Sequence, residues 1–217
     1  MRNLRIWFSK TGRVKYVSHL DLMRCFTRAF RRSGVPLWYT EGFNPHPYMT
    51  FALPLPLGVE SSDDVLDIRV DGYMENAEII ERLNAALPEG LSVTRAEEPW
   101  GKPGEIAFAR YEYEFDKINF DAEKLREILS GGEIICERPG KQSGKKVMKQ
   151  FNLAEHIKEF AIAENEECFM LDMTLAAGVS ANVNPITAAE AILRLGGPEA
   201  KNIRRTALLT QGGGIFV

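Results

Sequence analysis

Four arginines recur at helical spacing within residues 18–34 and could bind phosphate. On a helical wheel Arg24, Arg28, Arg31 and Arg32 share one face, opposite the apolar side chains of the same segment. Guanidinium groups match phosphate oxygens in both geometry and charge. An ordinary solvated face usually mixes both signs of charge, and here Asp21 is the one acid. The pattern therefore favours an anion-binding helix over a merely solvated one.

The stretch Gly-Phe-Asn-Pro-His-Pro at residues 42–47 is a second candidate for contact with nucleic acid. Its two prolines stiffen the loop, and its glycine permits a tight turn. Asn44 offers both a donor and an acceptor, so it could recognise a base edge. Phe43 could stack on a base, and we include His46 in the same predicted contact. A rigid structural turn between two strands explains the pattern equally well.

Two histidines, His19 and His46, could act together as a general acid and base. They would then make the chain a metal-independent endoribonuclease, which is our alternative hypothesis. The competing interpretation is that His19 packs against the fold, and it is the one we favour for a histidine near an apolar face. Two histidines without a third ligand make a poor metal site, so we expect no metal and no other cofactor.

The elements that must position these residues form two α+β modules of antiparallel sheet covered by helices. In the first module we expect a strand, a helix, two or three strands, a helix and a strand. This order is the split βαβ, or ferredoxin-like, pattern. The predicted strands are residues 4–9, 37–40, 48–53, 65–70 and 91–96, and the predicted helices are 18–32 and 76–87.

The second module repeats the same theme more loosely. We place the first module at residues 1–98, a linker at 99–105 and the second, divergent ferredoxin-like module at 106–217. Its predicted strands are 109–115, 133–137, 167–175 and 203–210, and its predicted helices are 121–129 and 185–195. Residues 138–149 carry five Lys or Arg and no acid, and we expect a basic loop there. It could be a second phosphate contact or a flexible solvated loop.

Composition restricts the class of protein. Residues 1–50 hold nine Lys or Arg against two Asp or Glu, whereas residues 51–100 hold three against eleven. This asymmetry fits an anionic partner, or else two blocks that neutralise each other within the fold.

No apolar run approaches the length of a bilayer span and the N-terminus does not resemble a secretory signal, so we expect no membrane association. Three widely spaced cysteines predict no disulfide framework and fit a reducing cytoplasm.

A longer pattern extends over the first hundred residues. It reads SHLDLMR…RAFRRSGVPL…EGFNPHP…FALPLPLGVES, followed by LNAALPEGL. This string closely resembles the radical SAM-linked (radical SAM-associated) domain, a family of unknown function, in its standalone form. The resemblance implies a role related to RNA or the ribosome, because standalone members are commonly encoded beside ribonuclease E/G-type and ribosomal protein genes. The chain has no CxxxCxxC motif and so cannot hold the radical SAM cluster itself.

Together these observations predict a non-catalytic RNA-binding or adaptor protein in RNA modification, RNA processing or ribosome-related metabolism. The expected partners are tRNA or rRNA, with a radical SAM enzyme or a ribonuclease E/G-type enzyme as a possible protein partner. Two alternatives stay open at this point. One is the endoribonuclease above, whose layout looks like that of CRISPR repeat-processing enzymes. The other is a protein-only interaction module for a radical SAM enzyme.

Overall fold

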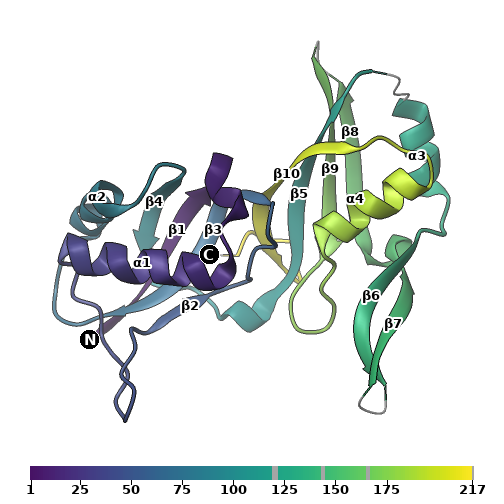
Figure 1. Ribbon diagram of the computed structural model, residues 1–217. Helices are drawn as coiled ribbons and strands as arrows, with labels where there is room; N and C mark the ends of the chain where they lie inside the picture. The colour runs from purple at the N-terminus through teal and green to yellow at the C-terminus, as the bar shows by residue number, and fades with distance from the viewer. Residues whose placement is uncertain (119–121, 143–144, 165–166, 217) are drawn as a thin grey trace. The chain divides into compact units, whose positions relative to one another are not determined.

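The computed structural model describes residues 1–118, 122–142, 145–164 and 167–216 (Figure 1). The chain divides into two compact units, each a mixture of helices and antiparallel strands. The first unit contains Met1–Glu105 and also Arg205–Ala207 and residues 215–216 from the end of the chain. The second contains Ile106–Arg204 and Leu208–Gly214. The first unit therefore uses residues that lie a hundred positions beyond its main segment.

The first unit contributes four strands to the larger sheet, with helices on one face of these strands (Figure 1). Its strand order is β4-β1-β3-β2, and each neighbouring pair is antiparallel. The elements are β1 (Arg2–Lys10), η1 (Gly12–Tyr16), α1 (His19–Ser33), β2 (Met49–Phe51), β3 (Glu60–Val70), α2 (Asn76–Ala86), β4 (Leu91–Glu97) and η2 (Pro103–Glu105). Both predicted helices are present within a residue or two of their predicted ends.

The core of the first unit lies between its sheet and its two helices. Leu4, Ile6 and Phe8 are every second residue of β1, so they share the face of the strand that packs in this core, and all three are fully buried. Phe26 of α1 meets the Phe8 ring edge-on, with the ring centroids 4.9 Å apart. Because α1 turns its apolar face inward, its arginines are left on the solvent side.

Helix α1 begins and ends where the sequence predicts. The Ser18 hydroxyl accepts a hydrogen bond from the Asp21 backbone N–H, which caps the first turn. The same hydroxyl donates to Asp21 Oδ2 at 2.8 Å. Gly34 ends the helix with φ of 70°, a left-handed conformation that costs glycine little. These two caps fix the register of the arginine face.

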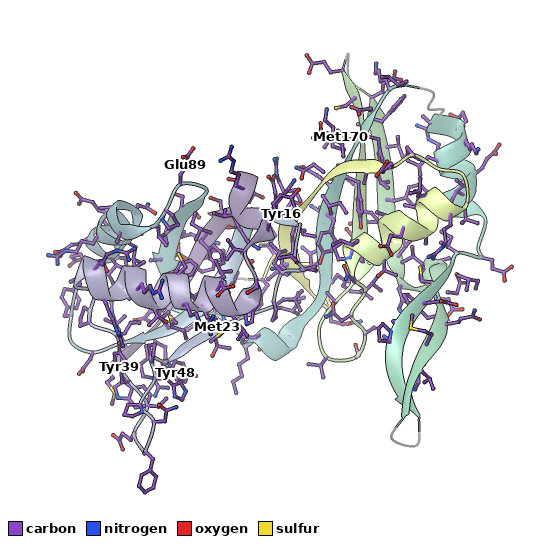
Figure 2. All side chains as sticks on the ribbon, in the orientation of Figure 1. Tyr16, Met23, Tyr39, Tyr48, Glu89 and Met170 are labelled. Carbon is purple, nitrogen blue, oxygen red and sulfur yellow. The ribbon has the colours of Figure 1, made fainter. Side chains whose placement is uncertain are left out.

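A narrow hairpin joins α1 to β2. Residues 37–40, predicted as a strand, form single bridges, one of which joins Tyr39 to Pro47. The Tyr48 N–H donates to the Trp38 carbonyl at 3.0 Å and closes the base. Figure 2 shows Tyr39 and Tyr48 where this hairpin leaves the body of the unit. The loop 42–47 is the tip.

A buried ion pair lies within the first unit, between Asp64 of β3 and Arg205 of the last strand, β10 (Ala200–Thr210). Arg205 and Asp64 have side chains 0% and 1% exposed, and an Arg205 NH2 nitrogen donates to Asp64 Oδ1 at 2.6 Å. Arg205 also donates to the Leu53 carbonyl at 2.8 Å. A charge so completely removed from water is tolerated only with such partners.

A third buried charge stands beside this pair. The Lys10 ammonium donates to the Lys15 and Val17 carbonyls, each at 3.2 Å. Burial lowers the pKa of Lys10, while the Asp64 carboxylate raises it and Arg205 lowers it further. The two carbonyls belong to the turn directly before α1, so Lys10 holds the start of that helix in place.

The second unit has the strand order β10-β5-β9-β8, with a separate hairpin formed by β6 and β7 (Figure 1). Its other elements are β5 (Ile106–Asp116), α3 (Ala122–Ser130), β6 (Ile135–Gln142), β7 (Lys145–Asn152), η3 (Leu153–His156), β8 (Ile157–Glu164), β9 (Cys168–Ala176) and α4 (Pro185–Arg194). Residue 121, the predicted first residue of α3, lies outside the described residues.

The prediction of a basic loop at residues 138–149 is wrong for the residues that the structure describes. Residues 138–142 belong to β6 and residues 145–149 to β7, and Arg138 pairs with Lys149 across the two strands. Residues 143 and 144 lie outside the described residues. Pro139 and Gly140 gave the segment the local composition of a loop. Proline and glycine are tolerated in this hairpin because it is only two strands wide, so each strand keeps one unpaired edge.

Candidate nucleic-acid interface

An open pocket of about 420 Å³ lies along the solvent side of α1. It is lined by Asp21, Arg24, Cys25, Arg28, Arg32 and Pro88. The three arginines stand four residues apart, so they form one row along the helix with about 6 Å between successive members. Three of the four predicted phosphate-binding arginines therefore share one pocket.

The opposite wall of the pocket is the turn between α2 and β4. Pro88 belongs to this turn, and the Thr11 N–H donates to the Gly90 carbonyl at 2.9 Å. Gly90 has φ of 87°, and a Cβ there would lie 2.6 Å from the Thr11 carbonyl oxygen. Only glycine fits this close approach of two backbones. The position of the wall is thus set by packing against the segment that leads into α1.

The three arginines of the row differ in what else they bind. Arg24 pairs with Asp21 at 2.9 Å, and Arg32 donates to the Ala86 carbonyl at 2.6 Å. The latter contact satisfies an open carbonyl at the end of α2. Arg28, in the middle, has no hydrogen bond or ion pair with any residue that the structure describes. Its guanidinium is available to a ligand.

The pKa values of the two titratable groups beside the arginines, Asp21 and Cys25, are shifted in opposite directions. A hydrogen bond from Ser18, then one from Arg24, lowers the pKa of Asp21, so its carboxylate is ionised near neutral pH. Burial raises the pKa of the Cys25 thiol more than Arg32 and Arg28 lower it. The pocket thus offers three cations, one anion and a neutral thiol, which suits binding better than nucleophilic attack.

Arg31, the fourth predicted phosphate contact, is placed elsewhere. Its Nε donates to the Tyr39 hydroxyl at 3.3 Å, at the base of the hairpin. It is absent from the residues that line the pocket. Arg31 therefore connects α1 to the hairpin.

The tip of the hairpin holds a defined shape. His46 Nδ1 lies 3.1 Å from both the Thr40 hydroxyl and the Asn44 carbonyl oxygen, and the His46 N–H donates to the same hydroxyl. Phe43 is fully exposed at the turn. An exposed aromatic ring on a pre-formed loop is suited to stacking, because little entropy is lost on binding.

At the base of the hairpin, the side chain of Arg69 packs against two aromatic rings, a contact that the sequence did not predict. The Arg69 guanidinium carbon lies 4.8 Å from the Trp38 ring centroid and 4.5 Å from that of Tyr48. Its Nε donates to Asn3 Oδ1 at 3.1 Å. Arg69 alternates with buried residues of β3, which signals that it faces away from the core, but nothing local identifies its aromatic partners.

The structure gives the two histidines separate surroundings. His19 meets Phe51 edge-on, with centroids 5.1 Å apart, which is the packing role favoured from the sequence. His46 is bound within the hairpin tip. No hydrogen bond or ring contact joins the two within the described stretch 1–118. The geometry adds no support for a paired acid and base.

The described residues contain no group of three or more His, Cys, Asp or Glu side chains that could hold a metal ion. None of their helices is long and apolar enough to cross a membrane. Within the same ranges, none of Cys25, Cys136 and Cys168 forms a disulfide.

Comparison with known proteins identifies the family but not a function. No curated protein matches the chain. Among solved structures, the chain is similar to one in "Crystal Structure of a Cbf5-Nop10-Gar1 Complex", with 14% identity and a TM-score of 0.49. The match covers 94% of this chain and 48% of that chain, so this protein spans about half its length. Residues 3–185 match the model of "Uncharacterized protein conserved in bacteria (DUF2344)", and the chain therefore belongs to this family.

Proposed function

We propose that this protein binds RNA without catalysing a reaction, and that it serves as an adaptor in RNA modification or processing. The observation that supports the proposal is the row of Arg24, Arg28 and Arg32 around one open pocket. Its central member, Arg28, has no hydrogen bond or ion pair within the described residues. An arginine row of this kind neutralises successive phosphates of a strand.

In this proposal the hairpin supplies selectivity. Phe43 would stack on an unpaired base, and the exposed side chains of Asn44 and His46 would contact base or sugar edges. Arg31 would reach a phosphate from the base of the hairpin, where it already contacts Tyr39. Stacking needs a base free of its own duplex, so the ligand is a single-stranded segment or loop of tRNA or rRNA.

The protein partner belongs to the same proposal. The resemblance of residues 2–100 to the radical SAM-linked domain supports a radical SAM enzyme that receives the bound RNA, with a ribonuclease E/G-type enzyme as the alternative recipient. We also propose that both units are ferredoxin-like modules. Their strand orders, β4-β1-β3-β2 and β10-β5-β9-β8, support this. A protein-only adaptor is the competing function.

The salt dependence of RNA binding tests this proposal. Because the three arginines of the pocket and Arg31 would each contact a phosphate, we expect the logarithm of the association constant for a single-stranded RNA to fall with log salt with a slope of about −3. Fluorescence anisotropy between about 50 and 200 mM salt measures it. The absorbance ratio at 260 and 280 nm after purification at low salt should also reveal bound nucleic acid. If no RNA binds at low salt, the protein-only adaptor is correct instead.

A further inference from the structure

One residue of the pocket is not explained by phosphate binding. Asp21 lines the pocket among three arginines, and its side chain is 58% exposed. An ionised carboxylate repels phosphate and attracts hydrogen-bond donors. In the first turn of α1 the carboxylate also favours the helix dipole, but its exposed side lies in the pocket and is open to a ligand. The carboxylate therefore points to a ligand that brings a donor together with its phosphates.

Asp21 has room to accept such a donor. Its Oδ2 accepts from the Ser18 hydroxyl at 2.8 Å and its Oδ1 accepts from Arg24 at 2.9 Å. A carboxylate provides about four acceptor positions, so each oxygen retains one for a ligand. The two protein contacts hold the carboxylate in a fixed orientation at one end of the arginine row.

We infer that Asp21 binds a ribose hydroxyl, so that the pocket selects ribonucleotides over deoxyribonucleotides. This inference rests on the proposed RNA binding. The 2′-hydroxyl is the group that separates RNA from DNA, and acidic side chains bind it in dinucleotide sites. The hydroxyl that Asp21 binds could belong to an internal sugar or to the terminal sugar at the 3′ end of an RNA, which carries two hydroxyls.

The spacing of the pocket suits a sugar beside its phosphate. Asp21 and Arg24 differ by three residues, or about 4.5 Å of helix rise, and Arg28 lies about 6 Å further along. A sugar on Asp21 would therefore place its own phosphate near Arg24 and the next one near Arg28. The volume of about 420 Å³ falls within the range of pockets that hold small ligands.

The experiment compares matched single-stranded RNA and DNA by fluorescence anisotropy. The wild type should bind RNA at least about tenfold more tightly, as one hydrogen bond to a charged group provides. In Asp21→Ala this ratio should fall to about one, because RNA loses its acceptor and DNA loses a repulsive charge. Asp21→Asn should lie between the two, since its amide oxygen still accepts.

The matched control separates recognition from helix capping. Ser18→Ala removes the cap and one of the two contacts that orient the carboxylate, while Arg24 still holds its Oδ1. This variant should therefore lower stability and keep at least part of the RNA preference, which Asp21→Ala loses. An RNA with a 2′-deoxy sugar at its 3′ end distinguishes the two sources. If this RNA loses its advantage over DNA, the sugar bound by Asp21 is the one at the 3′ end. If the advantage is kept, Asp21 binds an internal sugar.

Two results would overturn the inference. One is equal affinity of the wild type for RNA and DNA, and the other is an unchanged ratio in Asp21→Ala. In either case, binding that still depends on Arg28 would leave the proposed function standing. If neither nucleic acid binds, both proposals fail together.

Discussion

Arg28→Glu is expected to weaken the binding of single-stranded RNA by about 10- to 100-fold, because it removes one phosphate contact and adds a repulsive charge. Arg28 stands in the middle of the pocket row, between Arg24 and Arg32. It has no hydrogen bond or ion pair within the described part of the chain. The substitution should therefore leave the free energy of unfolding nearly unchanged, and the loss is one of binding.

Two further variants make this result specific to the pocket. Arg126→Glu makes the same change of charge on α3 of the second unit, where Arg126 pairs with Glu123, and it should bind RNA almost normally. Arg28→Lys keeps the charge but loses the planar fork, so its loss should be smaller. Arg28→Ala should also reduce the salt slope by about one. If Arg28→Glu and Arg126→Glu bind RNA with equal affinity, the pocket is not the RNA-binding site.

Asp64→Ala is expected to lower the free energy of unfolding of the first unit by about 3–5 kcal/mol, because it leaves the charge of Arg205 buried without its carboxylate. This is a large share of the stability of a typical domain, about 5–15 kcal/mol. Arg205→Met should cost a similar amount, since it leaves the Asp64 carboxyl buried without its arginine. Replacing both partners by apolar side chains should restore part of the loss.

Urea unfolding followed by tryptophan fluorescence measures these changes. Trp7, Trp38 and Trp100 are the three tryptophans of the chain, and all lie in the first unit. The signal therefore reports the unit that holds the ion pair. The double variant Asp64→Leu with Arg205→Met supplies the last corner of a double-mutant cycle. Single variants that cost less than about 1 kcal/mol would show that the pair is dispensable.

Local signals were enough to predict α1 and its arginine face. Ser18 and Gly34 mark the ends of the helix, and the spacing of its apolar residues identifies the buried side. The same wheel placed Arg31 with the other arginines. In the structure Arg31 instead contacts Tyr39. The position of Tyr39 depends on how the hairpin folds back, and the residues of the helix alone do not determine it.

The features that sequence reasoning missed depend on residues far apart in the chain. Arg205 and Asp64 are separated by 141 positions, and Asn3 and Arg69 by 66. No periodicity links such pairs, because periodicity reports only which way a side chain faces. The hairpin of β6 and β7 shows the same limit, since its Pro and Gly indicated a loop while cross-strand pairing determined the strands.

Alkylation of Cys25 is the measurement that tests most directly whether RNA occupies the arginine pocket. Cys25 lines the pocket and is half-buried, Cys168 is half-buried in the second unit, and Cys136 is buried. With saturating single-stranded RNA, mass spectrometry should show slower labelling of Cys25 and an unchanged rate at Cys168. RNA that binds at saturation and leaves the Cys25 rate unchanged would contradict the account, because the strand would then lie elsewhere on the protein.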